Sequence, residues 1–550
     1  MAAGVIALAA TLASQPLLGR ISFPNSGLPA AQAPFIRGVL LLHSFEYDDA
    51  IAAFREAQRA DPGFALAYWG EALSYHQPLW YNESVEKARA ALAKLGPTAS
   101  ARQGKAATPR EKGYLDAVER LFGQAELRGG GPGLDNAARR QAYADRMAEL
   151  SRANPNDDEA AAFYALALLA TIPDGQRNPT VSLKAGAIAS AILKRNPEHP
   201  GAAHYALHAY DDGEHAAMGL EAARIYARIA PASSHARHMP SHAFLPLGLW
   251  DEAAASDEAA WQTSIDLAKK KGLSAAQYDY HALGWLHYEY LQQGRFEKAR
   301  SLEPLVEAAL AVQGGTAKAV PYRDGSGLSA SGHQHVESEI GRGSGPLSLK
   351  SERASMRARF VVESGRWELM KGQPSFDNVD ELFALGLASV KLGDRGRAEA
   401  ALEQLAGARA AAPDADSKRL AEIMYREAGG LYQILRGEKR EGLAALESAA
   451  GIESETPKPI ARPYPVKPAG ELYAEALLAS GDAAGAVREF QLALKRTPRR
   501  AASLLGLARA AAAAKQPAIA RQAAREFVTI WQHADAGRPE LAEMRRLTQP

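Results

Sequence analysis

The chain has 550 residues, with 64 Lys and Arg against 63 Asp and Glu, so its formal net charge is +1. This balance excludes the strongly basic composition typical of proteins that bind nucleic acid or anionic membranes. Cysteine is absent, which excludes disulfides, thiolate metal sites, iron–sulfur clusters and cysteine nucleophiles. The apolar runs of the sequence are shorter than the roughly 18 residues of a membrane-spanning helix, and abundant alanine favours helices.

The N-terminus predicts a secretory signal. Met1 to Ala13 is a stretch of mostly small, apolar residues, followed by Ser14-Gln15-Pro16. It resembles the apolar core of a signal with a small-residue cleavage site. The positive charge that normally precedes such a core is missing, since the first basic residue is Arg20. We therefore expect a signal segment within residues 1–20 and a periplasmic or secreted protein. The alternative is a frayed helix at the start of a cytoplasmic protein.

Two distant segments share a pattern with a period of about 34 residues. Small residues at positions 8, 20 and 27 would let two antiparallel helices approach closely, and a proline at position 32 would end the second helix. In residues 31–62 these positions hold Gly38, Ala50, Ala57 and Pro62, with Phe54 at position 24. In residues 467–498 they hold Ala474, Ala486, Ala493 and Pro498, with Gly481 and Phe490 at positions 15 and 24. Partial matches include Gly386, Gly393, Ala398 and Leu402 in one unit, and Gly294 and Ala299 in another.

With this spacing, residues 21–535 resemble a tetratricopeptide-repeat (TPR) protein of the bacterial exported type. The resemblance implies an all-α solenoid in which helix hairpins stack into a right-handed superhelix, and the first helix of each hairpin lines a concave groove. We expect an N-terminal block over residues 21–312 and a C-terminal block over 351–550. Residues 313–350, rich in Gly and Ser, are predicted to form a linker or loop between them. An insertion at 98–155 includes a helix that begins at the capping box Thr108-Pro109-Arg110-Glu111.

Histidines recur on this repeat pattern. The chain has 14 histidines, and two HxxxH pairs lie one repeat apart, since His204 and His208 precede His238 and His242 by 34 residues. Side chains at i and i+4 share one face of a helix. By the TPR resemblance, all four occupy positions 5 and 9, which line the groove. The resemblance also places His235, His281, His43 and His76 at groove positions, whereas His287 falls at a packing position.

Four imidazoles on one face predict a transition-metal site. A His pair at i and i+4 chelates such metals well, and a second pair would complete the coordination of zinc, copper or iron. We expect His204, His208, His238 and His242 to be ligands, with His281 or Asp212 as a fifth ligand or proton acceptor. Pro240 stands between His238 and His242, so the helix there either begins near Pro240 or is kinked.

Two functions follow from these observations. The first is a solenoid whose groove holds a divalent transition metal, with hydrolytic or oxidative catalysis if a coordination position stays open. The second is a metal-free TPR scaffold that binds a peptide, a protein partner or a small molecule in the groove, as this repeat family most often does. Structural histidines without a ligand are a third interpretation. The sequence lacks HExxH, a P-loop, a dinucleotide-binding glycine motif and GxSxG, and so gives no support to the enzymes that use them.

Overall fold

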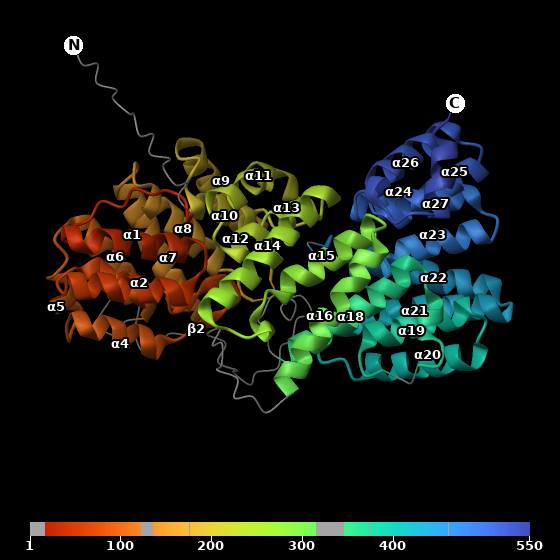
Figure 1. Cartoon of the computed structure of the whole chain (residues 1–550), viewed down its shortest axis with the longest axis horizontal. Coiled ribbons are helices and arrows are strands. Elements are labelled where there is room, and N and C mark those ends of the chain that lie inside the picture. The colour runs from red at the N-terminus through yellow and green to blue at the C-terminus, as the bar shows by residue number, and fades with distance from the viewer. Residues whose placement is uncertain are drawn as a thin grey trace, which may run out of the picture.

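The structure is a computed structural model that describes residues 17–122, 136–174, 176–314, 346–373, 376–459 and 461–549. Within these ranges the chain is built from α-helices, short 3-10 helices and one two-stranded sheet. Consecutive helices pack against each other along the chain (Figure 1). The predicted fold class, an all-α TPR-like solenoid, is confirmed.

The helices fall into two runs along the sequence. The first run is α1 (Pro29–His43), α2 (Tyr47–Ala60), α3 (Ala65–Leu73), α4 (Val85–Leu95), α5 (Ala99–Gln103), α6 (Pro109–Phe122), α7 (Asn136–Ala153), α8 (Asp158–Ala170), α9 (Pro179–Arg195), α10 (Pro200–Ala209), α11 (Leu220–Ile229), α12 (Ser234–His238), α13 (Ser241–Phe244) and α14 (Trp250–Lys271). The second run is α15 (Tyr280–Gln292), α16 (Phe296–Gly314), α18 (Pro346–Ser364), α19 (Val379–Lys391), α20 (Arg395–Ala410), α21 (Ala415–Arg436), α22 (Lys439–Ser454), α23 (Ala469–Ala479), α24 (Ala483–Arg496), α25 (Ala501–Ala513), α26 (Pro517–Ile530) and α27 (Pro539–Leu547).

The remaining elements are short. The 3-10 helices are η1 (Pro78–Trp80), η2 (Ala216–Gly219), η3 (Ala275–Gln277), η4 (Trp367–Met370) and η5 (Trp531–His533). The strands β1 (His76–Gln77) and β2 (Asn82–Glu83) pair antiparallel, with His76 opposite Glu83.

Small residues allow the close helix packing that the repeat pattern predicts. A Cβ added to Gly38 in α1 would lie 2.8 Å from the ring of Phe54 in α2, and one added to Gly70 in α3 would lie 2.3 Å from the same ring. The C-terminal repeat has the same arrangement, because a Cβ on Gly506 in α25 would lie 2.1 Å from the Phe490 ring in α24. One phenylalanine therefore fills the space left by glycines in neighbouring helices.

The turns and the insertion also follow from the sequence. Gly393 and Gly481 have φ values of +74° and +93°, so each ends its helix in the left-handed conformation that favours glycine. In the insertion, α6 begins with the expected capping box. The Thr108 hydroxyl accepts a hydrogen bond from the Glu111 backbone N–H at 3.2 Å, and a Glu111 carboxylate oxygen accepts one from the Thr108 N–H at 3.1 Å.

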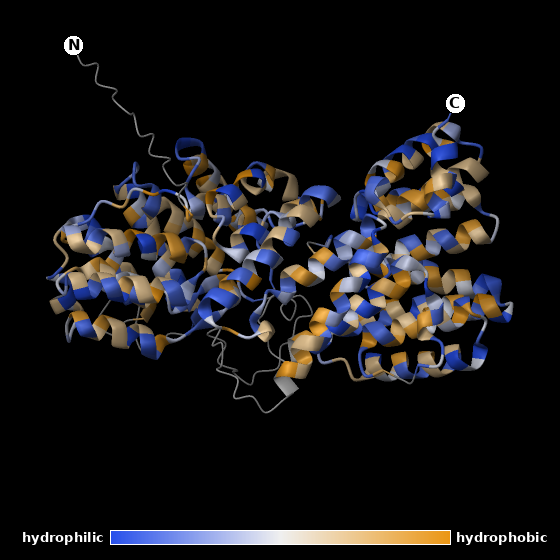
Figure 2. Cartoon of the chain, viewed as in Figure 1, coloured by the Kyte–Doolittle hydropathy of each residue, from blue (hydrophilic) through white to orange (hydrophobic). Residues whose placement is uncertain are grey.

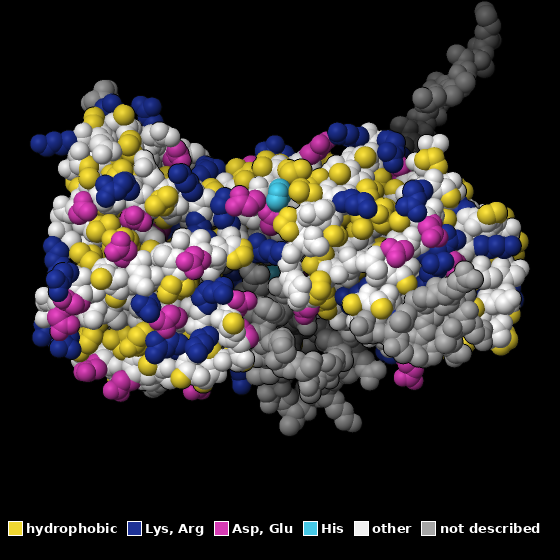
Figure 3. Space-filling view, turned by 180° about the vertical axis from the view of Figure 1, so that it is seen from behind, with side chains coloured by type: hydrophobic (Ala, Val, Ile, Leu, Met, Phe, Trp, Pro, Cys, Tyr) yellow, Lys and Arg dark blue, Asp and Glu magenta, His cyan; other side chains and the backbone are white. Residues whose placement is uncertain are grey.

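The core is divided into clusters along the chain. One cluster of buried residues draws on helices from α1 to α14, a second joins Trp250 and Ala254 of α14 to later helices, and a third lies within the C-terminal helices. Hydrophobic and hydrophilic residues alternate along the helices, as expected where one face of each helix packs inward (Figure 2). On the face seen in Figure 3, basic and acidic side chains are interspersed. None of the described helices is long and apolar enough to cross a membrane.

The helices that carry the histidines lie in the middle of the molecule. In Figure 1, α10, α12, α13 and α15 lie between the N-terminal helices and the C-terminal stack. The C-terminal repeats contact this region directly, since the Trp250 indole N–H donates to the Arg499 carbonyl at 2.9 Å and the Ala501 N–H donates to the Gln292 side chain at 3.1 Å. The expected signal segment falls mainly on residues 1–16, and the expected linker mainly on 315–345, outside the described residues.

Candidate metal centre

Two helices present the first histidine pair and its neighbour. Helix α10 begins at Pro200, and the ring of His199 caps it by accepting the Ala202 N–H at 3.2 Å. His204 and His208 follow one turn apart on its inner face. Helix α12 begins after Ser233, whose hydroxyl accepts the Ala236 N–H at 3.2 Å. Such caps satisfy the free N–H groups at a helix start and fix where each helix begins.

The helix is interrupted at Pro240, as the sequence suggests. Helix α12 ends at His238 and α13 starts at Ser241, because proline cannot donate the next helical hydrogen bond. The Ser241 hydroxyl donates to the His238 carbonyl at 2.7 Å instead. His238 therefore belongs to the end of one short helix and His242 to the next, yet their rings still meet.

The first group of histidines, here called triad A, consists of His204, His208 and His235. The Nε2 atom of His204 lies 3.0 Å from Nε2 of His208 and 3.0 Å from Nε2 of His235. One donor atom from each residue lies within 4.8 Å of the other two. His204 is buried, and His208 and His235 are partly exposed, so triad A is open on one side.

The second group, triad B, consists of His238, His242 and His281. The Nε2 atoms of His238 and His242 are 3.0 Å apart, and a ring nitrogen of His281 completes the group within 4.8 Å. His238 is buried, whereas His242 and His281 are partly exposed. The two triads thus have the same composition, with one buried and two partly exposed imidazoles.

The partners of the Nδ1 atoms fix the tautomers of three rings. His204 Nδ1 lies 2.6 Å from the His43 carbonyl, His238 Nδ1 lies 2.6 Å from Asp257 Oδ1, and His242 Nδ1 lies 2.9 Å from Asp211 Oδ2. A carbonyl can only accept, so the Nδ1 of His204 carries the proton, and the same holds for His238 and His242 when the carboxyl group facing each is ionised. In a neutral ring Nε2 then carries a lone pair. When both rings are neutral, the 3.0 Å contact between the Nε2 atoms of His238 and His242 joins two lone pairs, and only a proton or a metal ion between them can bridge the two atoms.

Burial disfavours the charged form of four of the triad histidines, His204, His208, His235 and His238. It lowers the pKa of His204 to about 3. It also holds the pKa values of His208 and His235 well below the ordinary value, and positive charge on the other triad histidines lowers them further. Burial and the charge of His242 lower the pKa of His238 as well. Neutral imidazole is the form that binds transition metals.

A pair of carboxyl groups stands behind His238. Burial raises the pKa of Asp257 well above its ordinary value, and burial together with the Asp257 charge raises that of Glu289. The two groups lie within interaction range of each other, and Asp257 Oδ1 contacts the His238 ring at Nδ1. A carboxylate on the far nitrogen of a metal-binding histidine fixes the ring and raises its basicity.

Each triad also has an aromatic neighbour. The Phe45 ring stacks on His208 and His235, with ring centroids 5.6 and 5.7 Å away. The Trp285 ring stacks on His242 at 4.5 Å. These rings shield one side of each triad from water, which lowers the local dielectric and strengthens interactions between the histidines and a bound cation.

A third group of buried ligand-type residues, His43, Glu159 and His199, differs from the triads because a carboxylate lies between its two rings. Glu159 oxygens lie 2.8 Å from His43 Nε2 and 3.1 Å from His199 Nε2. The other nitrogens are used by the Tyr205 hydroxyl at 2.8 Å and by the Ala202 N–H. This group is held by ion-pair and hydrogen-bond contacts, and the His43 carbonyl contacts Nδ1 of His204 at 2.6 Å.

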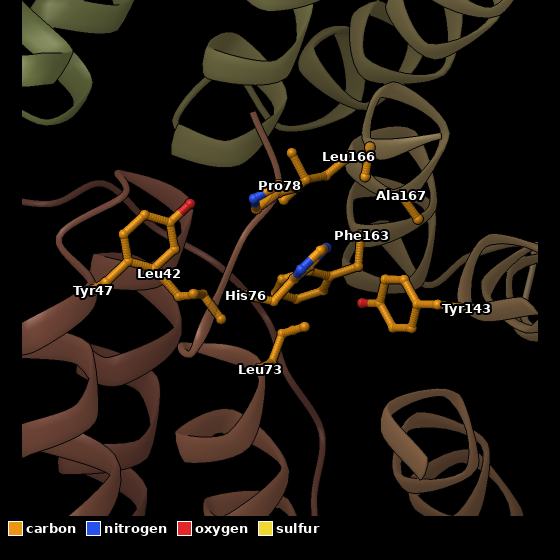
Figure 4. Close-up of a pocket in the computed structure, with 10 residues that line it drawn as sticks. Leu42, Tyr47, Leu73, His76, Pro78, Tyr143, Phe163, Leu166 and Ala167 are labelled. Carbon is orange, nitrogen blue, oxygen red and sulfur yellow. The ribbon is translucent and has the colours of Figure 1, made fainter. Parts of the chain in front are cut away.

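The other histidines named in the sequence lie apart from the triads. His76 lines a cavity of about 10 Å³ together with Leu73, Tyr143 and Phe163 (Figure 4), and its Nδ1 lies 3.5 Å from Glu83. His287 is buried in a packing position, as expected, with Nε2 3.8 Å from Glu303. His333 and His335 lie outside the described residues.

The structure groups the histidines across the two HxxxH pairs, and the sequence left open whether the pairs hold one metal ion or two. His204 and His208 meet His235, whereas His238 and His242 meet His281. Asp212, expected as a fifth ligand or proton acceptor, contacts neither triad, because its oxygens lie 2.9 and 2.7 Å from His215 Nδ1. The neighbouring Asp211 is the residue that contacts His242. Sequence reasoning missed Asp257, which is buried in α14 and lacks any local signal. That these residues bind metal remains a prediction.

Comparisons with known proteins give fold-level likeness only. No protein-family model matches the chain, and a search of curated proteins found no match. Among solved structures, the Cut9–Hcn1 hetero-tetramer of APC/C is 11% identical with a TM-score of 0.29, and the match covers 96% of this chain and 78% of that one. Yeast Tom70 is 11% identical with a TM-score of 0.31, covering 94% of each chain. The human IFIT1 dimer with m7Gppp-AAAA is 11% identical with a TM-score of 0.32, covering 93% of this chain and 92% of that one. Likenesses this weak carry no argument about function.

Proposed function

We propose that this protein binds two transition-metal ions, one in each histidine triad. The observation that carries the proposal is the convergence of ring nitrogens within each triad. The Nδ1 atoms of His238 and His242 contact carboxyl groups, while their Nε2 atoms face each other at 3.0 Å. Two neutral imidazole nitrogens at this distance repel unless a proton or a metal ion lies between them.

The donor set supports a metal of the zinc, copper or iron class. Imidazole nitrogen suits these metals, and Mg²⁺ or Ca²⁺ would require oxygen ligands. Two nitrogens 3.0 Å apart, each about 2.0–2.1 Å from one ion, subtend about 91–97° at that ion. A triad supplies three imidazole ligands, fewer than the four or more that such an ion normally takes. An open position is what a metal needs to bind a further ligand.

Elemental analysis tests the proposal directly. The protein is purified without an affinity tag or chelator, loaded with zinc, copper or iron in turn, and its bound metal is measured by mass spectrometry. We expect two equivalents per chain in the wild type and one in each of the variants His208→Ala and His242→Ala.

The matched control is His215→Ala. His215 lies seven residues beyond His208 and pairs with Asp212, outside both triads, so this variant is expected to keep two equivalents. Wild-type protein that binds no added metal would overturn the proposal and favour a metal-free TPR scaffold. Full metal content in the double variant His208→Ala/His242→Ala would show that the ligands lie elsewhere.

A further inference from the structure

We propose that the two triads form one dinuclear centre whose metal ions share a small anionic ligand of the hydroxide class. This inference rests on the proposed function and deepens it. Two separate mononuclear sites would each bind a ligand on their own, whereas a dinuclear centre binds one ligand between both ions.

One short helix supplies a ligand to each triad. His235 of triad A and His238 of triad B are both on α12, which spans only Ser234–His238. Residues three apart on a helix have Cβ atoms about 5–6 Å from each other. The two ions would therefore be held by neighbouring side chains of a single helical turn, which places the triads side by side.

A second connection runs from the helix of triad A to triad B. Helix α10 carries His204 and His208 and ends at Ala209. Two residues later, Asp211 accepts the Nδ1–H of His242 at 2.9 Å.

Charge balance favours an anion between the ions. All six imidazoles are neutral ligands, so two divalent ions would bring four positive charges into a partly buried site. The carboxyl groups hydrogen-bonded to these rings, Asp211 on His242 and Asp257 on His238, both serve triad B. In triad A the Nδ1 of His204 lies against a backbone carbonyl instead, so these contacts place no carboxylate there to offset the charge of an ion. Buried charge without a counter-charge is costly, and the open faces of the ions are where a counter-anion can bind.

A buried donor lies beside this region. The Trp285 indole ring stacks on His242, its side chain is 1% exposed, and its Nε1–H has no hydrogen-bond partner among the described residues. A buried N–H of this kind is normally paired. An anion held at the triads gives the adjacent Trp285 donor a candidate partner.

The test uses Cu²⁺-loaded wild-type protein, with copper counted by mass spectrometry and unpaired spins counted by electron paramagnetic resonance. Two Cu²⁺ ions that share a bridging anion couple their spins. We therefore expect the resonance spectrum to show far fewer unpaired spins than there are copper ions by mass spectrometry. We also expect an azide titration to saturate at one azide per two copper ions. His281→Ala removes a partly exposed ligand of triad B. This variant is expected to bind one copper ion and to show one unpaired spin for it.

The outcomes separate the two proposals. Two copper ions per chain with the full spin signal, each binding azide on its own, would overturn the shared centre and leave the proposed function standing. One copper or none in the wild type would overturn the proposed function itself. The decisive reading comes from the wild type, so it does not depend on whether His281→Ala folds; circular dichroism checks that variant.

Discussion

Asp211 and Asp212 are adjacent in sequence but have different roles in this structure, and replacing each in turn tests the site. Asp211 accepts the Nδ1–H of His242 at 2.9 Å, and both side chains are 15% exposed. Asp212 makes the same kind of contact with His215 at 2.7 Å, with side chains 19% and 28% exposed. Only the first pair holds a residue of triad B.

We expect Asp211→Ala to weaken metal binding at triad B by about 10- to 100-fold, the usual effect of removing a carboxylate behind a metal-binding histidine. That range corresponds to about 1.4–2.7 kcal/mol, which agrees with roughly 1.5–3 kcal/mol for a hydrogen bond to a charged group. Asp212→Ala is the matched control and is expected to leave the affinity unchanged.

The assay is a Zn²⁺ titration in competition with a chromophoric chelator. In Asp211→Ala, the affinity of one of the two bound ions should fall and that of the other should stay within a few-fold of the wild type. Equal losses in the two variants would refute the role given to Asp211, as would an unchanged affinity in Asp211→Ala.

Three further predictions concern stability and the other histidines. Glu159→Gln should destabilise the protein by about 1–3 kcal/mol, because an amide N–H would face a ring N–H in the buried network. The variant should still bind two metal ions. Loss of one ion would instead indicate that His43, Glu159 and His199 form a metal site. The metal-free protein should lose stability as the pH falls below 6.5, since His204 has a pKa of about 3 when folded against 6.5 when unfolded. The unfolded chain then takes up the proton first, and His204 alone lowers the free energy of unfolding by about 2 kcal/mol at pH 5. Urea denaturation at pH 5 and pH 7 measures this loss, and equal stability would contradict it. Gly70→Ala should cost about 1–3 kcal/mol because its Cβ would lie 2.3 Å from the Phe54 ring. The control Gly407→Ala, in an exposed turn of α20 with open space around it, should be neutral or slightly stabilising by thermal denaturation.

Repeat spacing predicted the fold because it reports local packing. Gly38, Phe54 and Phe490 occupy positions whose size is fixed by the neighbouring helix, so their pattern predicts a helix hairpin wherever it recurs. The capping box at Thr108 is equally local, since its partners are three residues apart.

The site could be predicted only in part, because it depends on contacts between distant segments. The HxxxH pairs identified four of the six triad residues, but the sequence alone did not indicate that His235 and His281 would divide those pairs between two groups. The carboxylates behind the rings come from a loop at Asp211 and from α14 at Asp257. The Asp211–His242 contact spans 31 residues, and periodicity within one helix carries no information about such a contact.

The central claim is that each triad holds a metal ion through its Nε2 atoms. Anomalous X-ray scattering, recorded at the absorption edge of the metal bound to crystals of the untagged protein, tests it most directly. The account predicts two anomalous peaks per chain, one among His204, His208 and His235 and one among His238, His242 and His281. Metal-loaded crystals with no peak at either triad, or with peaks only at other residues, would contradict it.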